Sequence, residues 1–207
     1  MKGPLVHGCY DLQTFKTLSS VGVETFAFDL RARSSNLVTY RQLRDLLGQL
    51  PVSDVILIFA EDSADTIASF LDLLKDTGKN FHLEFRDQQV PTYYERVGRP
   101  FYWYFSPDAD WSEILKLKNC VGVFLPLRYQ NLYHQLPQLW AIIEAGNLAI
   151  WLHAETLAEA SFFEGKTDVQ VSVDLFPELQ RSYRTVDQAT LRTMSLWRKL
   201  NESPAGQ

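Results

Sequence analysis

Short apolar runs alternate with longer amphipathic segments from one end of the chain to the other. The run at 55–59 reads Val-Ile-Leu-Ile-Phe, and such unbroken apolar stretches are typical of strands buried on both faces of a parallel sheet. We therefore predict eight strands, at 5–8, 24–30, 54–60, 81–86, 101–105, 120–125, 148–152 and 169–173.

Between these strands the apolar residues recur at helical spacing. Asp11, Thr39 and Ser63 are suited to cap the N-termini of the first three helices, and Gly78 is suited to end the third. Later helices are predicted within 110–117, 139–145, 156–163 and 187–200, with only one weak helical turn around 91–98.

Eight strand and helix pairs without linkers predict the α/β class and, within it, a single (β/α)8 barrel of minimal size that spans residues 1–207. An open, doubly wound sheet is the alternative. No G-x-G-x-x-G motif follows the first strand, which disfavours the dinucleotide-binding form of that sheet.

Composition narrows the range of partners. Lys and Arg number 20 against 25 Asp and Glu, a net charge of -5 without a dense basic block, so we expect no nucleic-acid partner. No apolar run approaches the ~20 residues that cross a bilayer, and no long apolar segment follows Met1. We therefore expect no membrane partner and a cytoplasmic protein. Cys9 and Cys120 stand outside any metal-binding spacing and are expected to be buried free thiols.

Several segments follow one another in the order of a known set of motifs. His7-Gly8 with Asp11 resembles an opening K-x-C-G-x-T, and Ser-Ser-Asn-Leu-Val at 34–38 resembles an S-P-R-Y-V loop. The segments 81–85, 148–157 and 169–172 stand where V-Q-L-H-G, G-G-L-x-P-x-N and V-D-V-S-S-G-V-E would stand. This series is similar to that of the phosphoribosylanthranilate isomerase family, the small barrel isomerases of tryptophan biosynthesis. The resemblance implies the same barrel and an aldose-to-ketose isomerisation without a cofactor.

The chain departs from the family where protons are transferred. The family uses a Cys at the end of the first strand as general base and an Asp at the end of the sixth strand as general acid. The corresponding places here hold His7 and either Leu125 or Pro126. Because neither Leu nor Pro can donate a proton, the resemblance implies a diverged member that lacks the family's acid and base.

The chain also departs where the family binds anions. The Arg of S-P-R, which the resemblance assigns to the substrate carboxylate, corresponds to Asn36. The glycines of the phosphate loops correspond to His153-Ala154 and Val173-Asp174, whose side chains obstruct close approach to the main-chain amides. Asp174 opposes an anion, and a protonated His153 would offset this in part. Arg31 or Arg33 could replace the lost carboxylate clamp, or both could be solvated loop charges.

Strand alternation predicts an unusually polar barrel interior. It points inward His7, His82, Glu84, Arg86 and either Gln170 or Ser172. His7 is either a general base or a structural, hydrogen-bonded imidazole. Glu84 and Arg86 either bind a polar ligand or neutralise each other. His153 and Asp174 form either an acid/base pair or two helix caps.

These alternatives give two sets of candidate residues. The catalytic candidates are His7, Asp174 and Glu84. The ligand-binding candidates are Arg31, Arg33, Asn36, Arg86, His153 and Ser172. A metal is not expected, because His7, His82 and His153 lie on different strands and only closure in the proposed register would bring them to Glu84.

Three functions are consistent with the sequence. The first is an isomerase-like barrel that is a pseudoenzyme or has an altered activity, with a small phosphorylated or carboxylated ligand. The second is an active isomerase with His7 as base and Asp174 or Glu84 as acid. The third is an interaction module that uses exposed aromatic residues around 93–104. The protein is expected to be a monomer or a homodimer.

Overall fold

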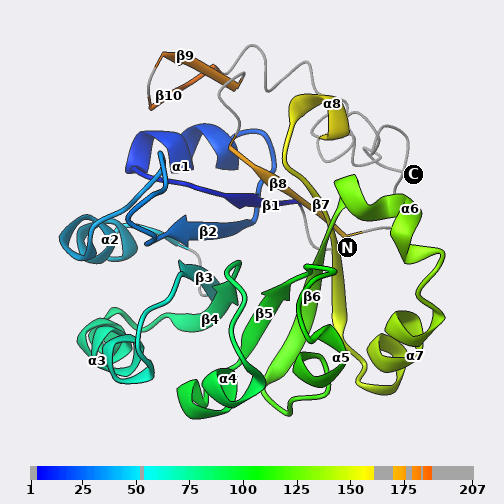
Figure 1. Ribbon diagram of the computed structural model, residues 1–207. Helices are drawn as coiled ribbons and strands as arrows, with labels where there is room; N and C mark the ends of the chain where they lie inside the picture. Colours follow the sequence, from blue (N-terminus) through cyan, green and yellow to red (C-terminus); the bar gives the residue numbers. More distant parts are fainter. Residues whose placement is uncertain (1–3, 52–53, 161–169, 176–178, 183, 188–207) are drawn as a thin grey trace, which may run out of the picture.

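Eight parallel strands close into a barrel, and helices surround it on the outside (Figure 1). The computed structural model describes residues 4–51, 54–160, 170–175, 179–182 and 184–187. The strands are β1 (Leu5–His7), β2 (Thr25–Asp29), β3 (Asp54–Phe59), β4 (Asn80–Phe85), β5 (Phe101–Tyr104), β6 (Cys120–Pro126), β7 (Ala149–Ala154) and β8 (Val171–Asp174).

The helices follow the strands in chain order. They are α1 (Leu12–Ser19), α2 (Tyr40–Leu47), α3 (Ala64–Leu74) with a 3-10 turn η1 (Lys75–Thr77), α4 (Pro91–Val97), α5 (Trp111–Ile114), η2 (Leu127–Tyr129), α6 (Gln130–Tyr133), α7 (Pro137–Ala145) and α8 (Leu157–Ala160). None of the described helices combines the length and the hydropathy of a membrane-spanning segment.

Closure of the barrel is direct. Each strand pairs in parallel with the next, and β1 pairs with β8 in a register that sets Val6 against Val173 and His7 against Asp174. The predicted barrel is therefore confirmed, and the open, doubly wound alternative is wrong.

Local signals in the sequence explain where the first helices begin. Asp11 accepts a hydrogen bond from the Thr14 amide at 2.7 Å, and Ser63 accepts one from the Thr66 amide at 3.1 Å. Thr39 forms a capping box with Gln42. These caps satisfy amides that have no partner inside the helix, so each helix starts at a fixed distance from the preceding strand.

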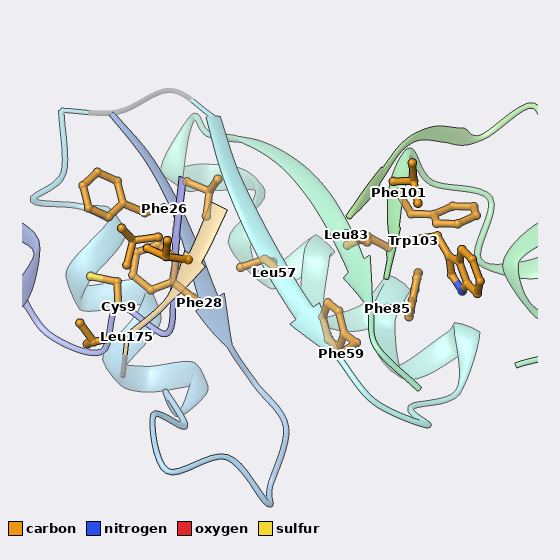
Figure 2. Packing of buried hydrophobic residues seen from close by; sticks show 14 of the residues in the cluster. Cys9, Phe26, Phe28, Leu57, Phe59, Leu83, Phe85, Phe101, Trp103 and Leu175 are labelled. Carbon is orange, nitrogen blue, oxygen red and sulfur yellow. The ribbon is translucent and has the colours of Figure 1, made fainter. Parts of the chain in front are cut away.

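Two apolar layers hold the barrel together. The larger lies between strands and helices and includes Phe28, Leu57 and Phe85 (Figure 2). The smaller fills the inside of the barrel and consists of Leu5, Ala27, Ile56, Ile58, Tyr104, Phe124 and Trp151. Because alternate residues of a strand face opposite sides, the inward rows continue from this smaller layer to the carboxyl ends of the strands.

Some predicted elements differ from the structure. The segment expected to hold one weak turn forms α4, which has seven residues, because Pro91 occupies the first helical turn and Gly98 (φ +62°) ends the helix. The segment after Pro126, where no helix was predicted, contains η2 and α6, and the Tyr133 hydroxyl donates to the Pro126 carbonyl at 2.8 Å. A hairpin of β9 (Gln180–Ser182) and β10 (Thr185–Val186) was not expected.

Parts of the last predicted elements lie outside the described residues. These are the end of the helix at 156–163, the start of the strand at 169–173 and nearly all of the helix at 187–200. The two thiols are as expected: Cys9 and Cys120 are free and buried, and burial raises the pKa of Cys120 to about 12.

One glycine makes room for an aromatic ring inside the barrel. Gly122 pairs in register with Tyr102, and a Cβ at position 122 would lie 2.8 Å from the Tyr102 ring and 2.6 Å from the Ala149 carbonyl oxygen. Both distances are shorter than van der Waals contact. A side chain at this position would therefore force either the ring or β7 to move.

We predict that Gly122→Ala lowers the free energy of unfolding by about 1–3 kcal/mol, the usual cost of overpacking. Chemical denaturation measures this change. Gly48→Ala is the matched control, because a Cβ there meets only carbonyl oxygens at 3.8 Å, and its stability should equal or slightly exceed that of the wild type. Equal stabilities for the two variants would contradict the close approach of Tyr102.

Candidate functional site

Ionisable side chains fill the carboxyl-terminal end of the barrel interior. His7 ends β1, Glu84 lies near the end of β4, His153 lies near the end of β7, and all three are buried. Arg86 follows β4, and Asp174 ends β8. In (β/α)8 barrels this end of the strands is where active sites are built.

Arg86 joins the two carboxylates of this end. Its Nε donates to Glu84 Oε1 at 2.7 Å, and its two Nη atoms donate to the two oxygens of Asp174 at 2.8 and 3.1 Å. The guanidinium also lies 4.8 Å above the centre of the Tyr104 ring. Arg86, with a side chain only 12% exposed, thus compensates two negative charges at once.

The two buried histidines lie between these charges. His7 Nε2 is 2.8 Å from Glu84 Oε2, close enough for an ion pair although the atoms are not aligned for a hydrogen bond. His153 Nδ1 is 2.9 Å from the Ser172 hydroxyl oxygen. The other nitrogens of the two rings face Asp174, His7 Nδ1 at 3.9 Å and His153 Nε2 at 3.6 Å.

Burial and charge shift the pKa values of these groups. Burial raises the pKa of Glu84, but the charges of His7 and Arg86 outweigh burial and hold it at about 2. Burial likewise opposes ionisation of Asp174, yet Arg86 and His153 hold its pKa well below the usual value. Burial lowers the pKa of His153 to about 4, against the attraction of Asp174. At neutral pH both carboxyls are therefore ionised and His153 is neutral.

A cavity of about 270 Å³ opens above this network. Its lining includes His7, Asp29, Arg31, Asn36, Arg86 and Asp174. Arg31 is held in place by Asp29, which accepts from its Nε at 2.9 Å and from its Nη2 at 2.7 Å. Asn36 lies against Gly8, where a Cβ would come within 2.7 Å of the Asn36 amide nitrogen. The cavity is therefore polar and offers fixed donors to a small ligand.

The structure separates the remaining ligand-binding candidates. Arg33 lines a second cavity, of about 290 Å³, with Ala60, Glu61 and Asp87, so it does not share the cavity that borders His7. His153 and Ser172 are buried and lie outside the lining of the first cavity, although His153 faces Asp174, which does line it. His82 lies two residues before Glu84 on β4, with its ring 5.7 Å from that of Tyr102. The structure thus brings His7, His153 and Glu84 together and places His82 beside Tyr102 instead.

Among the described residues, one other group could hold a metal ion. His7, His153 and Asp174 offer ligand atoms that all lie within 4.8 Å of one another.

The place of the family's acid holds apolar residues. Phe124 faces the barrel interior, and its ring centre lies 4.9 Å from that of His7. Leu125 is buried in the outer apolar layer, and Pro126 ends β6. The described residues at the end of β6 are therefore apolar.

Sequence reasoning missed three polar residues at the same rim. The Tyr104 hydroxyl donates to Glu155 Oε1 at 2.7 Å, and Arg128 forms an ion pair with the same carboxylate. Glu155 follows β7 directly, which was the signal for a rim position. Its partners are 51 and 27 residues away in sequence, and no local pattern links them.

Removal of Arg86 tests the charge network. We predict that Arg86→Met lowers the free energy of unfolding by about 3–5 kcal/mol, because it leaves buried carboxylates without a counter-charge. Urea denaturation at neutral pH measures the loss, and Glu84→Gln added to Arg86→Met should restore part of it. The control is Lys116→Met, which removes an exposed pair with Glu113 and should cost under about 0.5 kcal/mol. Similar losses for both single variants would contradict the network.

Comparison with known proteins identifies structures with a similar fold. Neither a family model nor a curated protein matches the sequence. A monomeric form of the dimeric phosphoribosylanthranilate isomerase of Thermotoga maritima is 12% identical over 97% of this chain and 98% of its own, with a TM-score of 0.69. A phosphoribosylanthranilate isomerase in complex with reduced 1-(o-carboxyphenylamino)-1-deoxyribulose 5-phosphate is 11% identical over 95% and 97% of the two chains, also with a TM-score of 0.69.

A structure of another class is also similar. An HpcH/HpaI aldolase from Desulfitobacterium hafniense is 12% identical over 100% of this chain and 95% of its own, with a TM-score of 0.60. At such identities the likeness concerns the fold. The chain is therefore a barrel similar to the phosphoribosylanthranilate isomerases in architecture, as the motif order implied.

Proposed function

We propose that this chain is an isomerase-like barrel that does not catalyse the isomerisation of phosphoribosylanthranilate and that binds a small carboxylated or phosphorylated ligand in the cavity above Arg86. The observation that carries the proposal is the double pairing of Arg86. It engages Glu84 and Asp174, the two carboxylates that were candidates to replace the lost acid.

The isomerisation needs a proton donor as well as a proton acceptor. With Arg86 bound, Glu84 and Asp174 keep their pKa values well below neutral and hold no proton to donate. The Tyr104 hydroxyl is already donated to Glu155. No described side chain of β6 replaces the acid, since Phe124, Leu125 and Pro126 occupy its end.

The alternative is an active isomerase with His7 as base. His7 does border the cavity, which supports this reading. Its Nε2, however, is directed to Glu84 at 2.8 Å, and its side chain is only 1% exposed. His7 is therefore better placed to pair with Glu84 than to accept a proton from a substrate in the cavity.

The interaction module has less support. Tyr94, Phe101, Trp103, Tyr104 and Phe105 are all buried. These rings are therefore not on the surface, where a partner protein could contact them.

Ligand binding is supported by the donors of the cavity. Arg31 is fixed by Asp29, and Asn36 and Arg86 share the same cavity. Asp174 also lines the cavity, and its charge is compensated by Arg86. This combination favours a ligand with one anionic group near Arg31 and polar groups near Asn36. Since an aldolase shares the fold, the architecture is compatible with chemistry other than isomerisation.

Activity tests the first half of the proposal. We expect no turnover of phosphoribosylanthranilate above background by the purified chain, measured by fluorescence beside an active isomerase. Turnover at an ordinary enzymatic rate that His7→Ala abolishes would overturn the proposal in favour of the active isomerase.

Binding tests the second half. Calorimetry with reduced 1-(o-carboxyphenylamino)-1-deoxyribulose 5-phosphate, which carries both a carboxylate and a phosphate, should show saturable binding. Arg31→Gln should weaken binding about tenfold, since a charge-assisted hydrogen bond is lost. Arg33→Gln, in the other cavity, should leave it unchanged. Absence of binding, or equal losses in the two variants, would contradict the assigned cavity.

A further inference from the structure

Three ligand atoms converge where β7, β8 and β1 meet. These strands are neighbours in the closed barrel, with His153 paired in register to Ser172 and His7 to Asp174. The register brings one ligand atom each of His7, His153 and Asp174 to within 4.8 Å of one another, and the nitrogens that face Asp174 are His7 Nδ1 and His153 Nε2. Two imidazoles and one carboxylate on three adjacent strands form a compact, rigidly supported set.

The two imidazole nitrogens of this set have Asp174 near them, at 3.9 Å from His7 Nδ1 and 3.6 Å from His153 Nε2. His7 and His153 are 1% and 0% exposed, and neither His7 Nδ1 nor His153 Nε2 makes a hydrogen bond among the described residues. An unsatisfied buried polar atom costs about 1–3 kcal/mol. Two such atoms directed toward one carboxylate form an arrangement that a shared metal ion would complete.

A second side chain orients each member of the set. The other nitrogen of His7 faces Glu84 at 2.8 Å, and the other nitrogen of His153 lies 2.9 Å from the Ser172 hydroxyl. Metal-bound imidazoles are characteristically oriented through their second nitrogen in this way. Arg86 holds Asp174 through both oxygens, which leaves lone pairs on each oxygen for a metal.

We propose that His7 Nδ1, His153 Nε2 and the carboxylate of Asp174 form a binding site for a divalent transition-metal ion of the Zn²⁺ type. The set differs from the one weighed in the sequence, because Asp174 takes the place of His82 and Glu84 moves to a supporting position. The proposal does not depend on the proposed function, since metal binding and isomerase activity are separate measurements.

Geometry and charge are compatible with such an ion. Ligand atoms around tetrahedral Zn²⁺ lie about 3.4 Å apart, given bonds of about 2.0–2.1 Å. His7 Nδ1 is 3.9 Å from Asp174 Oδ1, His153 Nε2 is 3.6 Å from Asp174 Oδ2, and the ligand atoms of the set all lie within 4.8 Å of one another. Side-chain movements of about 1 Å would therefore close the site to the tetrahedral spacing. Glu84 and Asp174 both carry negative charge beside the three ligand atoms, and Arg86 pairs with both, so a cation is compatible with the site.

The site adjoins the cavity. His7 and Asp174 both line it, and three protein ligands leave one position of a tetrahedral ion open. A carboxylate or phosphate oxygen in the cavity therefore has access to the ion. The imidazole donors favour Zn²⁺ or Co²⁺ over Mg²⁺, which prefers oxygen ligands.

Metal titration of the full chain tests the site. Protein freed of metal with a chelator is titrated with Zn²⁺ by calorimetry and with Co²⁺ by absorption. We expect about one equivalent per chain, ligand-field bands of four-coordinate Co²⁺, an increase in Tm with Zn²⁺, and no comparable effect of Mg²⁺. Failure to bind Zn²⁺ or Co²⁺ stoichiometrically would overturn the proposal.

Variants locate the ion. His153→Gln and Asp174→Asn should each weaken Zn²⁺ binding more than tenfold, and Ser172→Ala should weaken it about 10-fold or more through loss of ring orientation. His82→Gln is the matched control and should bind as the wild type does. Loss of binding in His82→Gln, with retention in His153→Gln, would overturn the assignment.

A measurement on the wild-type protein tests the metal site even if the variants do not fold. In ¹⁵N-histidine-labelled protein, Zn²⁺ should shift the resonances of His7 Nδ1 and His153 Nε2 and leave those of His82 and His134 unchanged. Shifts confined to His82 or His134 would contradict the site.

Discussion

The interior of this barrel depends on the pairing of Arg86 with two carboxylates. Removing an ion from water costs several kcal/mol even after relaxation of the protein, so buried charges persist only with close partners. Arg86 meets this condition for Glu84, which is fully buried, and for Asp174 at the rim. His7 and His153 then occupy the space between the carboxylates, above an apolar layer in the lower part of the barrel.

The barrel fold and the side chains at the ends of its strands are determined by different parts of the sequence. The strand order, the closure and the outer helices are those of the isomerase structures to which the chain is similar. At the carboxyl end of the strands, Arg86 binds Glu84 and Asp174, and the end of β6 is apolar. A barrel tolerates varied side chains at this rim, since its strands are held by the outer apolar layer and by backbone pairing, which the rim residues do not supply.

Much of the fold follows from local patterns in the sequence. Asp11, Thr39 and Ser63 were predicted caps, and each accepts the expected hydrogen bond. Helix α4 was predicted as only one weak turn, although Pro91 suits a first helical turn and Gly98 a helix end. The inward direction of His7, Glu84 and Arg86 followed from strand alternation. The choice of partners did not, because Arg86 and Asp174 are 88 residues apart and only barrel closure joins them.

The central claim is that Arg86 keeps both Glu84 and Asp174 ionised, so that neither can act as a proton donor. A ¹³C NMR titration of the side-chain carboxyls in metal-free protein measures this directly. The account predicts that both carboxyls remain ionised at about pH 3, below the usual range of carboxyl pKa values, and that Glu84 begins to protonate only as the pH approaches about 2. Protonation of either carboxyl near neutral pH would contradict the account.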